Sequence, residues 1–198
     1  MITSTRNGQS LGSKGWMAHV IAWSLYFALW CGVGLWARAE VSLTEYQVKA
    51  LCLLNFIKYV DWPPSAFGGS NTPITIGLYG ESKLTAALNA AVAGKAVEGR
   101  AIIIRQIAAA DDLSACQILF ISDSESSRMP GILDKAGALP ILTVGEDAAF
   151  TQNGGIINFV LKNGSVRLEI DLTAAKKAGV IIHSRLLAVA DVVKGKAD

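Results

Sequence analysis

Histidine and cysteine, the side chains that most often serve as catalytic bases, nucleophiles and metal ligands, are scarce in this sequence. Its 198 residues contain two histidines and three cysteines, and His183 is the one histidine beyond the first forty residues. Nucleophilic catalysis needs a base beside the nucleophile, and neither G-x-S-x-G, H-E-x-x-H nor a Walker loop occurs. We therefore expect a protein that is not an enzyme, in which His183 has a structural role.

Charged residues are also few, at 17% of the chain, and the two signs nearly balance. The formal net charge of +2 depends on three basic residues before position 40, which are Arg6, Lys14 and Arg38. Without them, 15 basic residues face 16 acidic ones, which gives a net charge of about −1. No basic stripe with interleaved aromatic residues remains, so we expect no nucleic-acid partner.

Cys52 and Cys116 are the cysteines that follow the first forty residues, and their spacing resembles that of no metal site. We therefore predict neither a metal nor a cofactor. In an oxidising compartment the two thiols could form a disulfide, although we expect one inside a helix and the other just before a strand. The sequence leaves this disulfide and a pair of buried thiols as alternatives.

One long uncharged run lies near the start of the chain, at residues 15–37. The small residues around Ala37-Arg38-Ala39 are typical of a signal-peptide cleavage site, so we interpret residues 1–39 as a secretory signal peptide. The run is also long enough to span a bilayer, which leaves a retained N-terminal anchor in the inner membrane as the alternative. Under either interpretation, residues 40–198 form one globular domain outside the cytoplasm.

Residues 45–64 predict a long helix that forms part of the core. Its apolar residues recur at helical spacing, and they are Val48, Leu51, Leu53, Leu54, Phe56, Ile57 and Val60. A capping box of Ser42 and Glu45 is expected at its start, and Pro63 and Pro64 are expected to end it.

Three polar residues interrupt the apolar pattern of this helix. Lys49 and Lys58 are expected to run their methylene stems along the helix to water. Asn55 lies between Leu54 and Phe56, so we expect it to need a fixed hydrogen-bond partner. Trp62, directly after the helix, either seals the core or stands at its rim as a contact residue, and we favour sealing.

Strand and helix patterns alternate through the middle of the chain. Short apolar runs predict buried strands at residues 74–80, 101–107, 117–122 and 140–145. Helices are expected at residues 81–93 and 124–135, the second kinked or divided by Pro130. This alternation predicts a parallel sheet with helices on both faces.

The last third of the chain departs from this alternation. Residues 155–161 and 165–170 flank Asn163-Gly164, which is the strongest short-range signal for a β-hairpin. The second arm has the alternating pattern of a half-exposed edge strand, whose unpaired backbone groups invite a partner strand. Asp171 or Thr173 is expected to cap a following helix that ends at Gly179. Ser184 is expected to begin a last helix, with Leu186, Leu187 and residues 189–193 available for docking. The predicted fold is a single three-layer α/β domain, with a mostly parallel sheet and an antiparallel C-terminal hairpin.

Ligands of open α/β sheets collect at the carboxyl ends of the strands. A candidate pocket there would involve Tyr79, Ser122, Ser124 and Gly145. We favour the alternative that these residues end strands and cap helices.

Several segments together resemble a known protein family. VKALCLLNFIKYVDWP, LFIS at residues 119–122 and GGIINFVLKNGSVRLEIDLTAAKKAGVIIHSRLL occur in the order found in the YfiR-like family of bacterial periplasmic proteins. The resemblance covers about residues 43–193. It implies that the motif residues, which are mostly structural, are Lys49, Asn55, Phe56, Trp62 and Pro63. Asp171 stands where many relatives carry asparagine, which leaves the details of the terminal region open.

The resemblance implies a regulator, because the best-studied relatives restrain a membrane-bound diguanylate cyclase from the periplasmic side. On that basis we expect a periplasmic, non-enzymatic protein that affects cyclic di-GMP and biofilm state. Its expected partners are a membrane-bound signalling protein, a second envelope protein that removes the inhibitor, and a second copy of the chain in a homodimer. The rival hypothesis is a periplasmic module that binds a small molecule or senses redox state.

Overall fold

The structure, a computed structural model, describes residues 43–108 and 112–195, and Leu43–Asp198 form one compact unit. The predicted leader at residues 1–39 lies outside the described residues, so its cleavage stays a prediction. Within the described ranges, no helix has the length and the apolar character needed to cross a bilayer.

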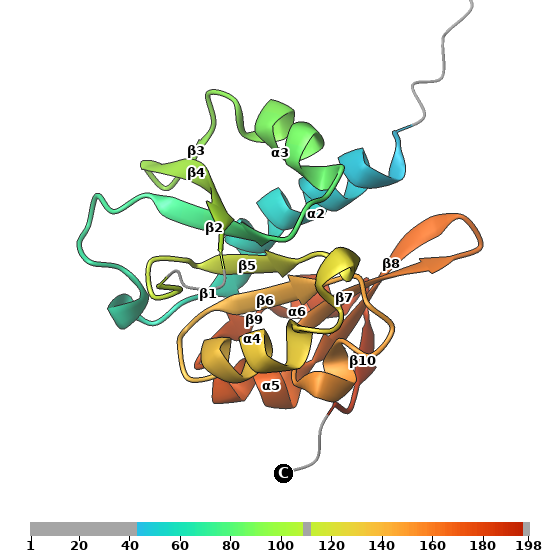
Figure 1. The fold of residues 1–198 in the computed structure, drawn as a ribbon. Coiled ribbons are helices and arrows are strands. Elements are labelled where there is room, and N and C mark those ends of the chain that lie inside the picture. The colour runs from blue at the N-terminus through green and yellow to red at the C-terminus, as the bar shows by residue number, and fades with distance from the viewer. Residues whose placement is uncertain (1–42, 109–111, 196–198) are drawn as a thin grey trace, which may run out of the picture. The chain divides into compact units, whose positions relative to one another are not determined.

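A mostly parallel sheet forms the middle layer of the domain (Figure 1). From one edge to the other its strands are β10 (Asp191–Val193), β8 (Ser165–Asp171), β7 (Ile157–Lys162), β6 (Leu142–Gly145), β5 (Ile118–Ile121), β2 (Ile74–Tyr79), β4 (Arg100–Ile107) and β3 (Ala96–Val97). Neighbouring strands from β4 to β7 are parallel, and so are β8 and β10. The β7–β8 and β3–β4 pairs are antiparallel. The predicted fold class, with its C-terminal antiparallel hairpin, is confirmed.

The two faces of the sheet belong to two separate hydrophobic clusters. In β5, Ile118 and Phe120 belong to the first cluster, and Leu119 and Ile121 to the second. Side chains of a strand alternate between the faces of a sheet, which explains the division. Helices α2 (Glu45–Tyr59), α3 (Leu84–Val92), α5 (Leu172–Lys177) and α6 (Ser184–Leu187) contribute to the first cluster, and α4 (Met129–Ala136) to the second. Figure 1 shows α2 and α3 across the sheet from α4, as predicted for three layers.

Helix α2 begins with a capping box, although not the predicted one. Gln47 N–H donates to Thr44 Oγ1 at 3.4 Å, and Thr44 N–H donates to Gln47 Oε1 at 2.8 Å. The prediction of Ser42 and Glu45 is therefore wrong, and Thr44 is the N-cap. Ser42 itself lies outside the described residues.

Helix α2 ends at Tyr59, four residues before the first proline. Val60–Asp61 form strand β1, which pairs antiparallel with β9 (Ile181–Ile182) in a separate small sheet. In addition, His183 N–H donates to Tyr59 O at 2.9 Å. The pairing of β1 with β9, a segment far along the chain, has no local sequence signal. The apolar pattern alone therefore predicted a helix that continues to the prolines.

The buried side of α2 differs in part from the predicted one. Leu53, Leu54, Phe56, Ile57 and Val60 are buried as expected, together with Ala50. Leu51 is 39% exposed, however, so it lies outside the core. Asn55 is also exposed, and the expected need for a fixed partner does not arise. Lys49 is 6% exposed, which contradicts the prediction that its ammonium group reaches water.

The helices between the strands are shorter than predicted. Helix α3 begins at Leu84 rather than Glu81, because residues 81–83 belong to the loop after β2. The segment at residues 124–135 is divided, as expected from Pro130, into a 3-10 turn at Asp123–Glu125 and helix α4. Pro130 lies in the first turn of α4, where a missing N–H leaves no helical hydrogen bond unmade.

The C-terminal hairpin follows its sequence closely. Asn163 and Gly164 have φ values of 52° and 72°, as a type I′ turn requires. Asp171 caps α5, since its Oδ1 accepts from Thr173 N–H at 2.8 Å and from Ala174 N–H at 3.3 Å. The residues after α6, expected to continue a helix, form strand β10 beside the end of β8. Strand β8 is therefore an edge strand over its first half only, which corrects the predicted edge.

Candidate functional site

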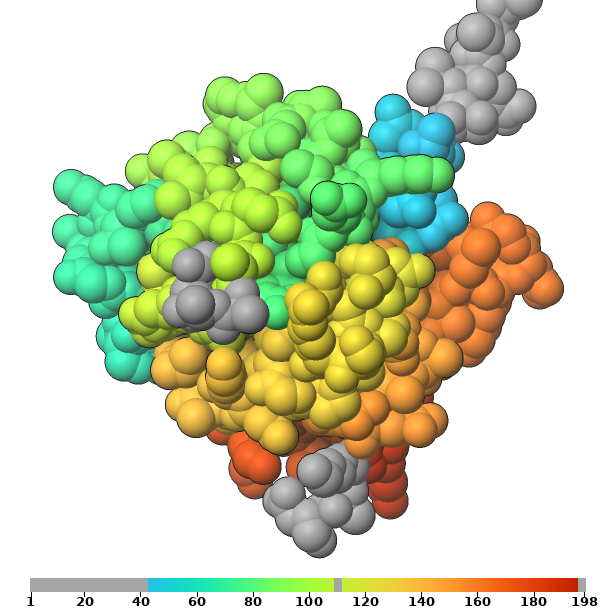
Figure 2. All heavy atoms as spheres, viewed as in Figure 1, coloured from blue at the N-terminus to red at the C-terminus, as the bar shows by residue number. Residues whose placement is uncertain are grey.

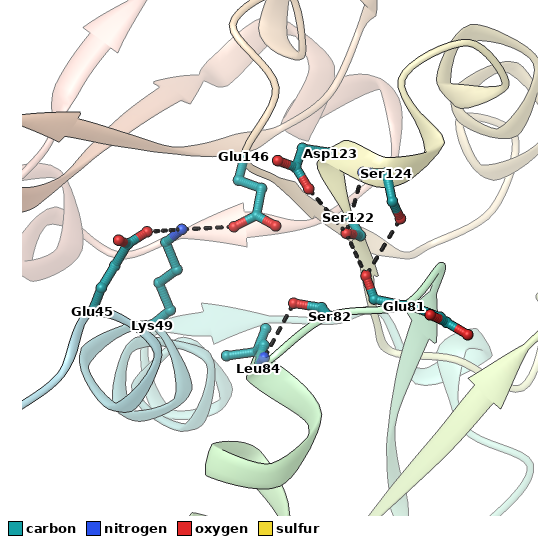
Figure 3. A network of polar contacts seen from close by, with 9 residues as sticks. All are labelled: Glu45, Lys49, Glu81, Ser82, Leu84, Ser122, Asp123, Ser124 and Glu146. Carbon is teal, nitrogen blue, oxygen red and sulfur yellow. Dashed lines mark hydrogen bonds and ion pairs between the residues drawn. The ribbon is translucent and has the colours of Figure 1, made fainter.

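The carboxyl ends of β2, β5 and β6 meet at one edge of the sheet, where an α/β domain offers its usual ligand site. Three loops form this edge, at residues 80–83, 122–128 and 145–150. Figure 3 shows the side chains of these loops together with Glu45 and Lys49 from the start of α2. This carboxyl edge contains all four predicted pocket residues, namely Tyr79, Ser122, Ser124 and Gly145.

Serine hydroxyls join the loop after β5 to the loop after β2 (Figure 3). Ser122 Oγ donates to Glu81 O at 2.9 Å, and Ser124 Oγ donates to the same oxygen at 3.3 Å. The two loops approach closely at Gly80, where a Cβ would lie 2.6 Å from Glu125 Cγ and 2.9 Å from Ser124 Oγ. Gly80 also has a φ of 87°, which favours glycine. The serines thus act as structural links between the loops.

The third loop places an aromatic ring where the predicted pocket would open. Phe150 is fully buried, and its ring lies between the Cα atoms of Gly145 and Gly155. A Cβ on either glycine would overlap the ring. The space beside Gly145 is therefore filled by the protein's own side chain.

Tyr79, at the end of β2, faces a hollow that does not include the other three predicted residues. It is 5% exposed and belongs to the second cluster. Together with Leu113, Arg128 and Ile132, it lines a hollow of about 350 Å³ that faces α4. Ser122, Ser124 and Gly145 do not line this hollow, so the four predicted residues do not converge on one pocket.

Lys49 of α2 places its buried ammonium group beside the loop after β6. Lys49 Nζ lies 2.5 Å from Glu45 Oε1 and 2.6 Å from Glu146 Oε2, as Figure 3 shows. Its position is also 5.4 Å from the ring centroid of Tyr46 and 5.9 Å from that of Phe159. The spacing of Glu45 and Lys49 fits an i,i+4 helix pair, but nothing in the sequence indicated the partner Glu146.

The two carboxylates determine the ionisation of Lys49. Burial alone lowers the pKa of this lysine, but hydrogen bonds and Coulombic attraction to Glu146 and Glu45 outweigh burial and raise the pKa above its ordinary value. The lysine therefore stays charged near neutral pH, and its ion pair with Glu146 links α2 to the carboxyl edge. A permanently protonated lysine cannot serve as a general base near neutral pH.

Trp62 is partly buried and packs against the first cluster. Its Nε1–H donates to Gln117 O at 3.0 Å, next to the start of β5. Gln117, which is 1% exposed, accepts from Thr75 N–H at 2.8 Å and donates to Ala66 O at 2.7 Å. Trp62 thus holds the chain after α2 against the sheet, a geometry that fits the favoured sealing role. No local pattern in the sequence indicates this role of Gln117.

His183, the lone histidine of the described residues, pairs with Asp61. Its Nε2 lies 2.7 Å from Asp61 Oδ2, and both side chains are partly exposed. The pair adjoins the small sheet of β1 and β9. His183 thus holds the segment after α5 to the end of α2, which fits a structural role.

No disulfide joins Cys52 and Cys116 in this structure. Cys52 packs against the first cluster, whereas Cys116 is buried in the second, on the other face of the sheet. Burial raises the pKa of the Cys52 thiol, which lowers the fraction of reactive thiolate. The arrangement fits the alternative of two separate thiols.

The remaining motif residues lie around the end of α2. Phe56 is 1% exposed and stacks on Phe159 of β7, with 6.1 Å between ring centroids. Pro63 precedes the 3-10 turn at Pro64–Ala66. Both residues fix how α2 meets the sheet, in keeping with a structural motif.

The carboxyl edge is rich in carboxylates, among them Glu81, Asp123 and Asp147. In the part of the chain that the structure describes, no group of three or more His, Cys, Asp or Glu side chains is arranged to hold a metal ion. A different hollow, of about 270 Å³, lies between α4 and α5 and includes the buried Thr143 and Asp171 in its wall. At the carboxyl edge Phe150 fills the space beside Gly145, while hollows remain beside Tyr79 and beside Glu81. The hollow between α4 and α5 is a further candidate for a small ligand.

Comparisons with known proteins give a family and a fold. A family described as YfiR/HmsC-like matches residues 46–191. A conserved domain protein from Vibrio cholerae O1 biovar El Tor has a similar solved structure, with a TM-score of 0.52 at 16% identity. The similarity covers 77% of this chain and 61% of the Vibrio protein, and at that identity it shows the fold alone. No match was found among curated proteins.

Proposed function

Because the chain belongs to the YfiR/HmsC-like family, we propose that it is a periplasmic, non-enzymatic regulator that binds a membrane signalling protein. The partner is the periplasmic part of an inner-membrane diguanylate cyclase, which the regulator restrains. Restraint lowers cyclic di-GMP and with it biofilm formation. A second envelope protein relieves the restraint by binding the regulator.

The observation that carries this proposal is the extent of the family match. Residues 46–191 include every helix of the described part of the chain, apart from the first residue of α2, and the sheet up to the start of β10. The packing beside Gly145 adds support, since Phe150 fills that part of the carboxyl edge, where ligands of α/β domains usually bind. A protein of this kind acts through its surface.

Restraint of a partner needs binding energy and no chemistry. A ligand shifts a two-state equilibrium by its difference in affinity for the two states. Binding the inactive cyclase about 3 kcal/mol more tightly than the active one would shift the ratio of states roughly a hundredfold. That difference is within reach of a few well-packed interface residues.

Gene deletion tests the proposal. We expect cyclic di-GMP to rise in the deletion strain and to return to its original level when the wild-type gene is supplied. Unchanged cyclic di-GMP in the deletion strain would contradict a diguanylate cyclase as the partner. Export is checked on the same cells, because cleavage before Glu40 predicts a periplasmic protein whose sequence begins at that residue, whereas a retained anchor predicts the full chain in the membrane fraction.

The hollow between α4 and α5 favours a second candidate, a module that binds a small molecule. A thermal-shift screen of periplasmic metabolites distinguishes the two functions. A ligand at a hundred times its dissociation constant adds about 2.7 kcal/mol to the free energy of unfolding. A hit that is lost on Thr143→Val, which removes the buried hydroxyl from the hollow, supports the second candidate, and a screen without such hits contradicts it.

A further inference from the structure

The first half of strand β8 is an open edge of the sheet. In the described sheet β8 lies between β7 and β10. Strand β10 pairs with Glu169–Asp171 of β8. Residues 165–168 therefore have no strand of the described residues on their outer side. We call residues 165–168 the open half of β8.

The hairpin register determines which backbone groups face this open side. The two-residue loop makes Lys162 and Ser165 a hydrogen-bonded pair, and Val160 and Arg167 are the next such pair. Hydrogen bonding alternates along an antiparallel strand, so Val166 directs its N–H and C=O away from β7. A strand edge of this kind is complemented by another extended strand.

Apolar side chains surround the open half of β8. Val189 is 66% exposed and lines a hollow of about 210 Å³ together with Leu168, Ala188 and Arg167. Leu161 on the neighbouring arm of the hairpin is 57% exposed. In Figure 2 the orange tip of the hairpin stands out from the body of the domain.

Two basic side chains, Lys162 and Arg167, lie beside the open half of β8 and differ in their ion pairs. Lys162 Nζ lies 3.0 Å from Asp191 Oδ2 and 3.7 Å from Glu169 Oε1, so its charge is compensated. Arg167 is exposed and has no ion-pair partner among the described residues. An incoming strand with a carboxylate opposite Arg167 would supply the missing charge.

The opposite edge of the sheet provides a comparison. Strand β3 pairs with Arg100 and Ala101, so most of β4 is also open on its outer side. Its one strongly exposed large apolar side chain is Ile103, at 43%. Unpaired backbone and an exposed arginine occur at both edges, but two strongly exposed large aliphatic side chains, Leu161 and Val189, lie beside the open half of β8.

We propose that an extended strand of a partner protein adds to the open half of β8. The strand pairs with the backbone of Val166, packs an aliphatic side chain against Val189 and places a carboxylate beside Arg167. This inference rests on the proposed function, because the strand belongs to the periplasmic part of the membrane signalling protein. It goes further by naming the contact surface and the form and charge of the occupant.

Val166→Pro tests the backbone pairing. Proline lacks the N–H that faces the open side, and it leaves the hydrogen bonds between β7 and β8 in place, so the edge tolerates it. The control Val166→Thr keeps the N–H and the branched shape. We expect Val166→Pro to weaken binding of the purified periplasmic part of the signalling protein about tenfold, the effect of one lost net hydrogen bond, while Val166→Thr binds as the wild type does. Equal affinities for the two variants would overturn the proposal.

Two further pairs of variants test the side chains. Val189→Asp is matched with Ile103→Asp, because both place a charge at an exposed aliphatic position, one at each edge of the sheet. Arg167→Glu is matched with Arg105→Glu, an exposed arginine of β4. We expect Val189→Asp and Arg167→Glu to lose binding, whereas Ile103→Asp and Arg105→Glu should bind as the wild type does. Loss in the β4 variants, with binding retained in the β8 variants, assigns the partner to the other edge and refutes the proposal.

Failure of the proposed function is separated from failure of this inference by a photo-crosslinking residue placed at position 167 or 103 in intact cells. A crosslink from position 167 to a membrane protein other than a diguanylate cyclase supports the surface and refutes the proposed partner. A crosslink from position 103 alone refutes the surface. If sedimentation shows a homodimer that Val166→Pro abolishes, the occupant is a second copy of this chain and the proposal of a partner strand is wrong.

Discussion

Phe150 provides the most direct test of the packing beside Gly145 at the carboxyl edge. Its ring is fully buried between Gly145 and Gly155, and a side chain at either glycine would overlap it. Because both neighbours are backbone, the ring cannot move away from a methyl group on Gly145 without meeting Gly155. We therefore expect Gly145→Ala to lower the free energy of unfolding by about 3 kcal/mol, at the upper end of the usual range for overpacking.

The companion variant Phe150→Ala removes the ring and leaves a cavity, for which we expect a cost of about 3–5 kcal/mol. The double variant is the decisive one, because the new methyl group then enters space that the ring has vacated. Adding Gly145→Ala to Phe150→Ala should cost no more than about 0.5 kcal/mol, so the two changes should be non-additive by about 2.5 kcal/mol.

Urea unfolding at neutral pH measures these differences, with unchanged m values as the check that both states stay comparable. Gly131→Ala in α4 is the control, since a Cβ there meets nothing within 4 Å. It should stabilise the protein by about 0.5–1 kcal/mol through helix propensity. If Gly145→Ala and Phe150→Ala prove additive, the ring does not fill the space beside Gly145, and a ligand could bind there.

The remaining predictions concern the other polar contacts. Lys49→Met should cost about 3 kcal/mol because Glu146 then lies buried without its cation, and Glu146→Gln in the same chain should recover part of the loss in urea unfolding. The folded pKa of Lys49 is raised, so its contribution to the free energy of unfolding is fully present below the unfolded pKa of about 10.4 and is lost as pH rises through the higher folded pKa. Stability should therefore fall at alkaline pH in the wild type, and less so in Lys49→Met. Gln117→Leu should cost about 3 kcal/mol, because Thr75 N–H and Ala66 O lose their partners, whereas Gln106→Leu at an exposed position should change stability by less than about 1 kcal/mol. Asp171→Ala should cost about 1–2 kcal/mol through loss of the α5 cap, while Asp171→Asn, which can still accept, should cost much less in thermal unfolding. A reducing agent should leave the melting temperature of the oxidised, purified protein unchanged, and a fall of several degrees would show that Cys52 and Cys116 pair after all.

Elements with a local physical cause could be predicted from the sequence. The type I′ turn at Asn163 and Gly164 follows from backbone conformations that few other residue pairs adopt. The cap at Asp171 depends on amides two and three residues away. The division of the helix around Pro130 follows from a missing N–H. In each case the interacting atoms lie within a few residues of one another, so the pattern is visible in one dimension.

The errors came where distant segments compete with a local preference. The helix at residues 45–64 has the composition to continue, but Val60 pairs with Ile182 and the chain leaves the helix there. Similarly, residues 191–193 have a helical neighbour before them and form a strand because β8 offers them an edge. Gly145 was a reasonable pocket residue until the ring of Phe150, whose position depends on a close approach to two glycines, filled the space.

The sequence by itself determined the order of strands and helices, the alternation that divides the core between two faces, the hairpin and the family resemblance. Only the tertiary structure decided that Lys49 pairs with Glu146, 97 residues away, and that Trp62 Nε1–H donates to Gln117 O, just before β5. It also decided that half of β8 stays open. The reason is physical. Period and turn chemistry depend on sterics between near neighbours, whereas ion pairs, buried amides and free edges depend on which remote segments the packed core brings together.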